Sequence, residues 1–138
     1  MRQAMFVLQA RGDRRGLTEI TDAVRGWLAK QEIRSGLLTL FCRHTSASLL
    51  IQENAARAVR SDLEKFFDEL APEGEHYEHD DEGPDDMPAH LKTALTQVQL
   101  NVPVMEGKLM LGTWQGIYLF EHRAHPSTRE IVLHLSGE

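Results

Sequence analysis

The stretch Leu37-Leu-Thr-Leu-Phe-Cys-Arg43 decides the fold, because it is apolar at almost every position and is followed at once by the polar run His44-Thr-Ser-Ala-Ser48. A short segment that is apolar on both faces is typical of a central strand covered on two sides. Functional side chains are commonly presented where such a strand ends and a loop begins. The sequence therefore predicts a sheet with this segment at its centre and a candidate site at its carboxyl end.

Strands and helices alternate outward from this segment. Residues 3–10 predict a first strand, Thr21-Asp22 start a helix that runs to about Gln31, and residues 46–52 predict a second, paired strand. Asn54 is expected to cap a helix that ends near Leu70.

In the second half of the chain, Pro88 suits the first turn of a short helix whose Leu91 and Leu95 face the core. Four further strands are expected over residues 98–104, 108–113, 115–121 and 129–135. This order predicts an α+β fold, with a mixed or largely antiparallel sheet and helices packed on it.

Length and composition narrow the class of protein. A chain of 138 residues is expected to form a single domain, residues 1–138, and no apolar run approaches the ~18 residues of a membrane span. The net charge of −6 argues against a nucleic-acid partner, which requires clustered Lys and Arg. Residues 1–8 predict a first strand rather than a leader, and the single Cys42 forms no internal disulfide, so we expect a cytoplasmic protein.

The segment from Tyr77 to Lys92 is the most polar part of the chain. It holds two histidines, six carboxylates and a lysine, and such a composition cannot build a core. Its side chains are either those of a solvated acidic loop, or they converge on a divalent cation or a metal-phosphate ligand.

Three histidines lie at predicted element boundaries beside polar residues. His44, His79 and His90 fit three metal ligands brought together from distant parts of the chain, and imidazole ligands favour zinc. Cys42 and His44 share one face of their strand, so a mixed Cys/His metal pair is weighed against a simple core thiol.

Two further groups carry polar residues inside the β region. The segment Gly112-Thr-Trp-Gln-Gly116 predicts either a bend with Trp114 in the core or a ligand contact. Glu121 and Arg123 lie two residues apart on one face of a strand, where they form either a surface ion pair or part of a site.

The motifs taken together resemble a known family. They are His44-Thr-Ser-Ala-Ser-Leu-Leu-Ile-Gln-Glu53-Asn54, Asp62, Tyr77-x-His79, Gly83-x-Asp85-Asp86-Met-Pro-Ala-His90-x-Lys92, Pro103-Val104, Gly112-Thr-Trp-Gln115, and Glu121-x-Arg123 followed by Arg129. This set is similar to the YjbQ family of secondary thiamine-phosphate synthases over nearly the entire chain. The family usually has Asp-Pro where this chain has Ala56-Arg57.

The resemblance implies a homotrimer of small α+β subunits, with a histidine-lined pocket that often holds a metal or an anion. It also implies that a pyrimidine diphosphate is joined to a thiazole phosphate with release of pyrophosphate. That reaction needs charge neutralisation on the leaving group and no covalent nucleophile.

The residues expected to carry the reaction fall into three groups. The catalytic candidates are His44, His90, Glu121 and Arg123; the substrate- or anion-binding candidates are Ser46, Ser48, Lys92, Thr113, Gln115 and Arg129; and the metal ligands are His44, His79 and His90. Zinc is the expected ion, with magnesium as the alternative for a diphosphate substrate. Two other functions stay open: a metal-dependent hydrolase of a small phosphorylated metabolite with Asp85 or Glu121 as base, and a non-catalytic trimer that binds a metal or an anion.

Overall fold

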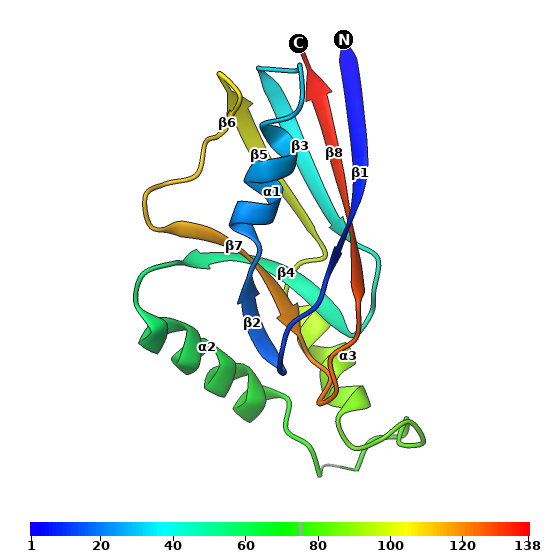
Figure 1. The fold of residues 1–138 in the computed structure, drawn as a ribbon. Coiled ribbons are helices and arrows are strands. Elements are labelled where there is room, and N and C mark those ends of the chain that lie inside the picture. The colour runs from blue at the N-terminus through cyan, green and yellow to red at the C-terminus, as the bar shows by residue number, and fades with distance from the viewer. Residues whose placement is uncertain (75) are drawn as a thin grey trace.

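The computed structural model describes every residue except Glu75 and arranges them as two antiparallel sheets and three helices (Figure 1). The five-stranded sheet has the order β1 (Arg2–Ala10), β8 (Arg129–Gly137), β3 (Gly36–Cys42), β5 (Gln99–Met105) and β6 (Lys108–Leu109). The three-stranded sheet has the order β2 (Gly16–Glu19), β7 (Gln115–Glu121) and β4 (Ala47–Glu53). The predicted α+β class with a largely antiparallel sheet is confirmed.

Strand β3 occupies the centre of the five-stranded sheet, between β8 and β5. Only one of its faces is covered, however: Leu38 and Leu40 are fully buried, whereas Leu37 and Phe41 are 40% and 42% exposed. Because side chains alternate along a strand, these two sets lie on opposite faces. The prediction that β3 is covered on both sides was therefore wrong.

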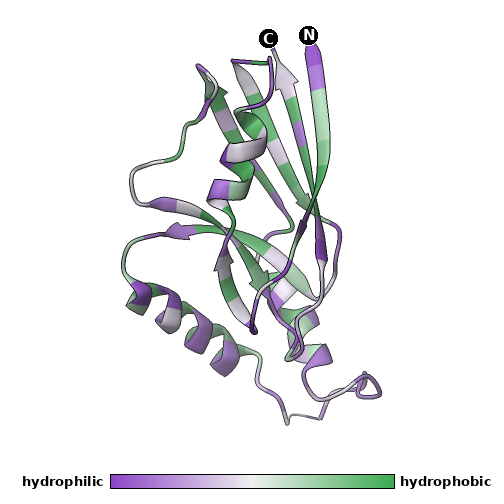
Figure 2. Ribbon diagram, in the orientation of Figure 1, coloured by the Kyte–Doolittle hydropathy of each residue, from purple (hydrophilic) through white to green (hydrophobic). Residues whose placement is uncertain are grey.

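One hydrophobic core fills the space between the inner faces of the two sheets and helix α1 (Thr21–Leu28), which contributes Val24 and Leu28. Figure 2 shows the resulting alternation of hydrophobic and hydrophilic residues along the strands. Helices α2 (Arg57–Leu70) and α3 (Asp86–Leu95) lie against the three-stranded sheet, where Phe67 meets Phe120 edge-on at 5.4 Å between ring centroids. None of the helices in the described part of the chain is long and apolar enough to cross a bilayer.

Several local predictions differ from the structure. The four-residue strand β2 was not predicted, and α1 ends at Leu28 rather than near Gln31. Asn54 does not cap α2, because its amide nitrogen lies 3.3 Å from the Thr113 carbonyl oxygen and α2 follows Ala56. In α3 the expected core residue Leu95 is 57% exposed.

A buried ion pair joins the two sheets where β7 ends and β8 begins. Glu121 is fully buried and Arg129 is 5% exposed. The Arg129 Nε donates to Glu121 Oε1 at 2.9 Å, and its second terminal nitrogen donates to Glu121 Oε2. Arg129 also donates to the Ser46 hydroxyl at 3.1 Å and to the Ser46 carbonyl at 3.2 Å. The guanidinium thus connects β7, β8 and the β3–β4 connection.

We predict that Arg129→Met destabilises the fold by ~3–5 kcal/mol, because it leaves the carboxylate of Glu121 buried without a counter-ion. The matched control is Arg43→Met, which removes the exposed Arg43–Glu130 pair and is expected to cost at most about 1 kcal/mol. Urea denaturation of both variants measures the difference. Equal stability of the two variants would contradict the anchoring role of Arg129.

Candidate metal centre

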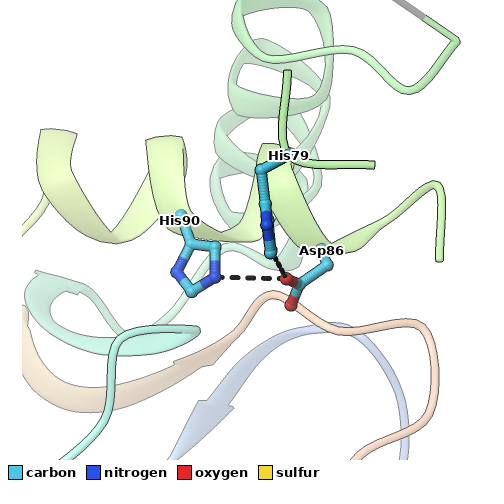
Figure 3. A group of neighbouring side chains, drawn as sticks. All are labelled: His79, Asp86 and His90. Carbon is cyan, nitrogen blue, oxygen red and sulfur yellow. Dashed lines mark hydrogen bonds and ion pairs between the residues drawn. The ribbon is translucent and has the colours of Figure 1, made fainter. Parts of the chain in front are cut away.

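Two histidines converge on one carboxylate oxygen of Asp86 (Figure 3). Asp86 Oδ2 lies 2.8 Å from His79 Nε2 and 3.2 Å from His90 Nε2. Asp86 is the first residue of α3, and His90 follows four residues later, so helical spacing places both side chains on one face. His79 reaches the same point from the acidic segment that precedes α3.

The hydrogen bonding of His90 fixes its tautomer. Its Nδ1 lies 2.9 Å from the Thr45 carbonyl oxygen, which can only accept, so Nδ1 carries the proton. In the neutral ring, Nε2 then has a lone pair that faces the Asp86 carboxylate. Two acceptors at this separation repel each other unless a proton or a cation lies between them. His79 Nε2 has a second carboxylate near it, at 3.0 Å from Glu82 Oε2.

These residues fit a divalent metal ion. One ligand atom from each of His79, Asp86 and His90 lies within 4.8 Å of the other two. Two ligands of a tetrahedral zinc ion are about 3.3 Å apart, given bond lengths of roughly 2.0–2.1 Å. Two imidazoles with one carboxylate are a donor set found in zinc sites, and ligating histidines commonly donate their other N–H to a carbonyl, as His90 does.

Arg123 holds the other side of the same carboxylate. One terminal nitrogen donates to Asp86 Oδ1 at 2.7 Å, Nε donates to Asp85 Oδ2 at 2.8 Å, and the other terminal nitrogen donates to the Glu82 carbonyl at 3.0 Å. The spacing of Glu121 and Arg123 had suggested an ion pair between their side chains, but these side chains do not pair. From Arg123, Glu121 accepts the backbone N–H alone, at 3.1 Å, and the ion-pair partner of Glu121 is Arg129.

The charges around Asp86 shift two pKa values in opposite directions. Burial alone would raise the pKa of Asp86, but the hydrogen bond from His79 and the charges of His90 and Arg123 together lower it below its ordinary value. The hydrogen bond to Asp86, helped by Asp81 and Glu82, raises the pKa of His79. Asp86 is thus ionised at neutral pH, and metal binding at His79 competes with a proton.

A cavity of about 950 Å³ adjoins this cluster. His90 lines it and therefore belongs to both features. Phe41, Cys42 and Val98 contribute apolar and weakly polar surface, and His44, Thr45 and Ser46 contribute polar groups. The cavity lies at the carboxyl end of β3, where the sequence predicted a site.

His44 lines the cavity but lies outside the group that converges on Asp86, among the residues that the structure describes. Its Nε2 accepts the backbone N–H of Glu130 at 2.7 Å, and its Nδ1 lies 3.4 Å from a terminal nitrogen of Arg129. Burial and the Arg129 charge lower the pKa of His44, so the ring is neutral. The third candidate metal ligand is therefore Asp86 rather than His44, which the sequence had predicted.

Cys42 behaves as a core thiol rather than as a metal ligand. Its sulfur lies 3.6 Å from the Ala47 carbonyl oxygen, and burial raises the pKa of the thiol to about 11. A protonated thiol does not bind zinc in place of a thiolate.

The other predicted binding residues divide between the cavity and more distant positions. Ser46 lines the cavity, whereas Ser48 is buried and bonded to His122 Nε2 at 2.9 Å. Lys92 is 3% exposed and pairs with Asp68. Thr113 and Gln115 lie at the end of β7 opposite Glu121, and Trp114 between them is 63% exposed rather than part of the core.

Sequence reasoning missed Asp86 as the centre of the cluster. The signal was present, because Asp86 and His90 are four residues apart in a helix whose first turn contains Pro88. It also missed the buried hydrogen bond between Ser48 and His122, whose residues lie 74 positions apart and show no pattern in the sequence.

Comparison with known proteins decides the family. The family model described as UPF0047 protein YjbQ-like matches residues 7–138. The chain belongs to the YjbQ family. It is 48% identical to the UPF0047 protein YjbQ of Salmonella typhimurium over 120 residues, which cover 87% of this chain and 85% of that protein. It is 45% identical to a UPF0047 protein of Synechocystis sp. over 137 residues, 99% of this chain and 92% of the relative.

Solved structures of YjbQ-like proteins share the fold. A YbjQ-like protein of unknown function from Sulfolobus solfataricus superimposes with a TM-score of 0.85 at 26% identity, covering 99% of this chain and all of the other. A conserved hypothetical protein from Thermus thermophilus gives a TM-score of 0.84 at 34% identity, with 95% and 99% of the two chains covered.

We predict that His79 stabilises metal-free protein at acidic pH. Because the folded-state pKa of His79 is raised, its contribution is fully present below the unfolded value of 6.5 and is lost as the pH rises through the folded-state value. Urea denaturation should therefore show a larger loss of stability for His79→Gln at about pH 5.5 than at about pH 8.5. The loss should shrink in an Asp86→Asn background, since Asp86 is the main cause. A loss independent of pH would contradict this assignment.

Proposed function

We propose that this YjbQ protein is a metal-dependent enzyme that joins a pyrimidine diphosphate to a thiazole phosphate and releases pyrophosphate. One observation carries the proposal: His79 and His90 converge on one oxygen of Asp86, and in the neutral ring the Nε2 lone pair of His90 faces that carboxylate, so that a divalent cation between them would be bound by all three side chains. The family resemblance supplies the reaction, and the cavity beside His90 supplies a place for the substrate. The single reduced Cys42 supports a cytoplasmic location.

His79, Asp86 and His90 are the residues that would hold the ion; Glu82 lies 3.0 Å from His79 Nε2 but belongs to a separate group with His79 and Asp81. Two imidazoles among the ligands favour zinc over magnesium, which prefers oxygen ligands, although a diphosphate would add oxygen ligands of its own. A bound divalent ion supplies positive charge to a leaving diphosphate. Arg123 serves the site indirectly, by holding Asp86 and Asp85 in place.

The cavity suits a ring with polar substituents. Phe41, Ala94 and Val98 offer apolar surface, while Thr45, Ser46 and the neutral His44 offer hydrogen-bonding groups. Its volume of about 950 Å³ lies in the range of small-molecule sites, roughly 300–1,000 Å³. We propose that a phosphorylated heteroaromatic metabolite binds here with its phosphates toward His90.

The hydrogen bonds of Asp85 and Glu121 favour group transfer over hydrolysis. A hydrolase needs a free base to activate water, and both carboxylates considered for that role are engaged. Asp85 accepts hydrogen bonds from Arg123 and from the Ala124 N–H, and Glu121 is buried with Arg129. Displacement of pyrophosphate from an activated carbon needs no such base.

We predict that the purified protein carries one divalent metal ion per chain, with zinc predominant, and that His90→Ala and Asp86→Asn each lose most of it. His134→Ala is the matched control, since His134 bonds to Gln3 in the five-stranded sheet, away from the cluster. Elemental analysis of the proteins, purified identically, measures the metal. Equal metal content in wild type and His90→Ala would refute the site.

The same preparations test the reaction when they are incubated with the pyrimidine diphosphate and the thiazole phosphate. The synthase is supported if wild type couples the two substrates and His90→Ala does so at a rate at least about a hundredfold lower, since metal-assisted charge stabilisation contributes several kcal/mol. Release of phosphate without coupling would instead favour the hydrolase, and tight binding without turnover would favour a non-catalytic trimer.

We also propose that the protein is a homotrimer, as the family resemblance implies. The outer face of the five-stranded sheet supports self-association, because it presents Met5, Leu37, Phe41 and Met105, each at least 40% exposed. The strand register places Phe41 beside Val132 and Leu37 beside Pro103, so the apolar side chains are neighbours. Exposed apolar patches of this kind commonly mark interfaces.

We predict that the protein forms a particle of three times the chain mass, which light scattering measures. Met5→Lys places a charge on the outer sheet face and is expected to shift the population toward smaller species. Phe66→Lys is the matched control, because Phe66 is 55% exposed on α2, which packs on the other sheet. A monomeric wild type at micromolar concentration, or equal effects of the two variants, would contradict the proposal.

A further inference from the structure

A second cavity, of about 520 Å³, lies at the end of the molecule opposite the acidic segment. Figure 1 shows α1 and the β5–β6 hairpin together at the end where both termini lie, with α3 at the other end. The cavity is lined by Arg25, Leu28, Arg34, Glu106, Lys108 and Leu109. It shares no lining residue with the cavity beside His90.

The guanidinium of Arg34 is held in place on the hairpin turn. The backbone N–H of Gly107 donates to the Arg34 carbonyl at 2.9 Å, and a terminal nitrogen of Arg34 donates to the Glu106 carbonyl at 2.9 Å. Glu106 and Gly107 both have positive φ, 53° and 74°, as a two-residue type I′ turn requires. A Cβ at Gly107 would lie 2.4 Å from a terminal nitrogen of Arg34, so the close approach depends on glycine.

Two of the three cations that line this cavity have no ion-pair partner in the part of the chain that the structure describes. Within the described chain, neither Arg34 nor Lys108 has an ion-pair partner, and Arg25 has only the exposed Asp22 at 3.8 Å. Among the described residues, Glu106 is the one acid that lines the cavity. Arg34 donates one of its five N–H groups to the Glu106 carbonyl, which leaves the other donors available for a ligand. This concentration of positive charge stands out in a chain whose net charge is −6.

The floor of the cavity is apolar, because the buried side chains of Leu28 and Leu109 line it. A preset guanidinium and an ammonium above an apolar floor match a ligand with one anionic group on an apolar body. We propose that this cavity binds a small organic anion, with its phosphate or carboxylate against Arg34 and Lys108 and its apolar part against Leu28 and Leu109. This inference is independent of the metal centre.

Titration calorimetry with phenyl phosphate tests the site. Arg34→Gln is expected to weaken the affinity by at least about tenfold, because it removes a charge-assisted fork, and Lys108→Gln to weaken it severalfold. Lys108 is exposed and makes no side-chain hydrogen bond in the described chain, so its variant should fold even if Arg34→Gln does not. Lys65→Gln is the matched control, because Lys65 is an exposed cation on α2 that lines neither cavity, and it should bind phenyl phosphate as wild type does.

Three further probes separate the parts of the proposed ligand. Benzoate is expected to bind and benzyl alcohol to fail, since the anionic group is required, while inorganic phosphate should bind more weakly than phenyl phosphate because it leaves the apolar floor uncovered. The proposal is overturned if wild type binds neither phenyl phosphate nor benzoate at millimolar concentration. It is also overturned if Arg34→Gln and Lys108→Gln bind like wild type, or if Lys65→Gln weakens binding as much as Arg34→Gln does.

Discussion

The rest of the structure depends on the buried ion pair between Glu121 and Arg129. Each charge is out of contact with water, so each is tolerable only while the other stays in place. The pair fixes the end of β7 against the start of β8, and through Ser46 it fixes the connection between β3 and β4. Because β4 and β7 belong to one sheet and β3 and β8 to the other, this contact joins the sheets at one end, in addition to the bridge between Leu49 and Gln97 and the shared core.

The geometry of the candidate metal centre follows from the same contact. Glu121 accepts the backbone N–H of Arg123, which aims that guanidinium at Asp85 and Asp86. Asp86 is then held by Arg123 on one oxygen and faces His79 and His90 with the other. Asp86 is nearly inaccessible to water and has a lowered pKa, so the ligand is ionised and directed before any cation arrives. Such preorganisation reduces the entropy that binding must overcome.

The sequence was sufficient for the fold class and for most of the strands, because alternation and turn residues are local signals. It was insufficient for the partners of charged groups. The spacing of Glu121 and Arg123 suggested one ion pair, yet the partners lie 8 and 37 residues away, where only the tertiary structure brings them. His44 illustrates the same limit. Its position at the end of a strand predicted a metal ligand, but the structure places His44 in the cavity wall and not in the group around Asp86. β2 escaped prediction because four residues carry too little periodicity.

The length of strand β7 separates two groups of predicted site residues within one chain. It runs from Gln115 to Glu121, and seven residues at roughly 3.3 Å each separate its ends by about 20 Å. Glu121 lies beside the metal centre, so Thr113 and Gln115 lie far from it, on a turn that the Gln115 side chain closes by accepting the Gly112 N–H at 2.8 Å. The turn presents Trp114 to solvent instead of packing it. Within one chain, Thr113 and Gln115 are therefore out of reach of a ligand held by His79 and His90.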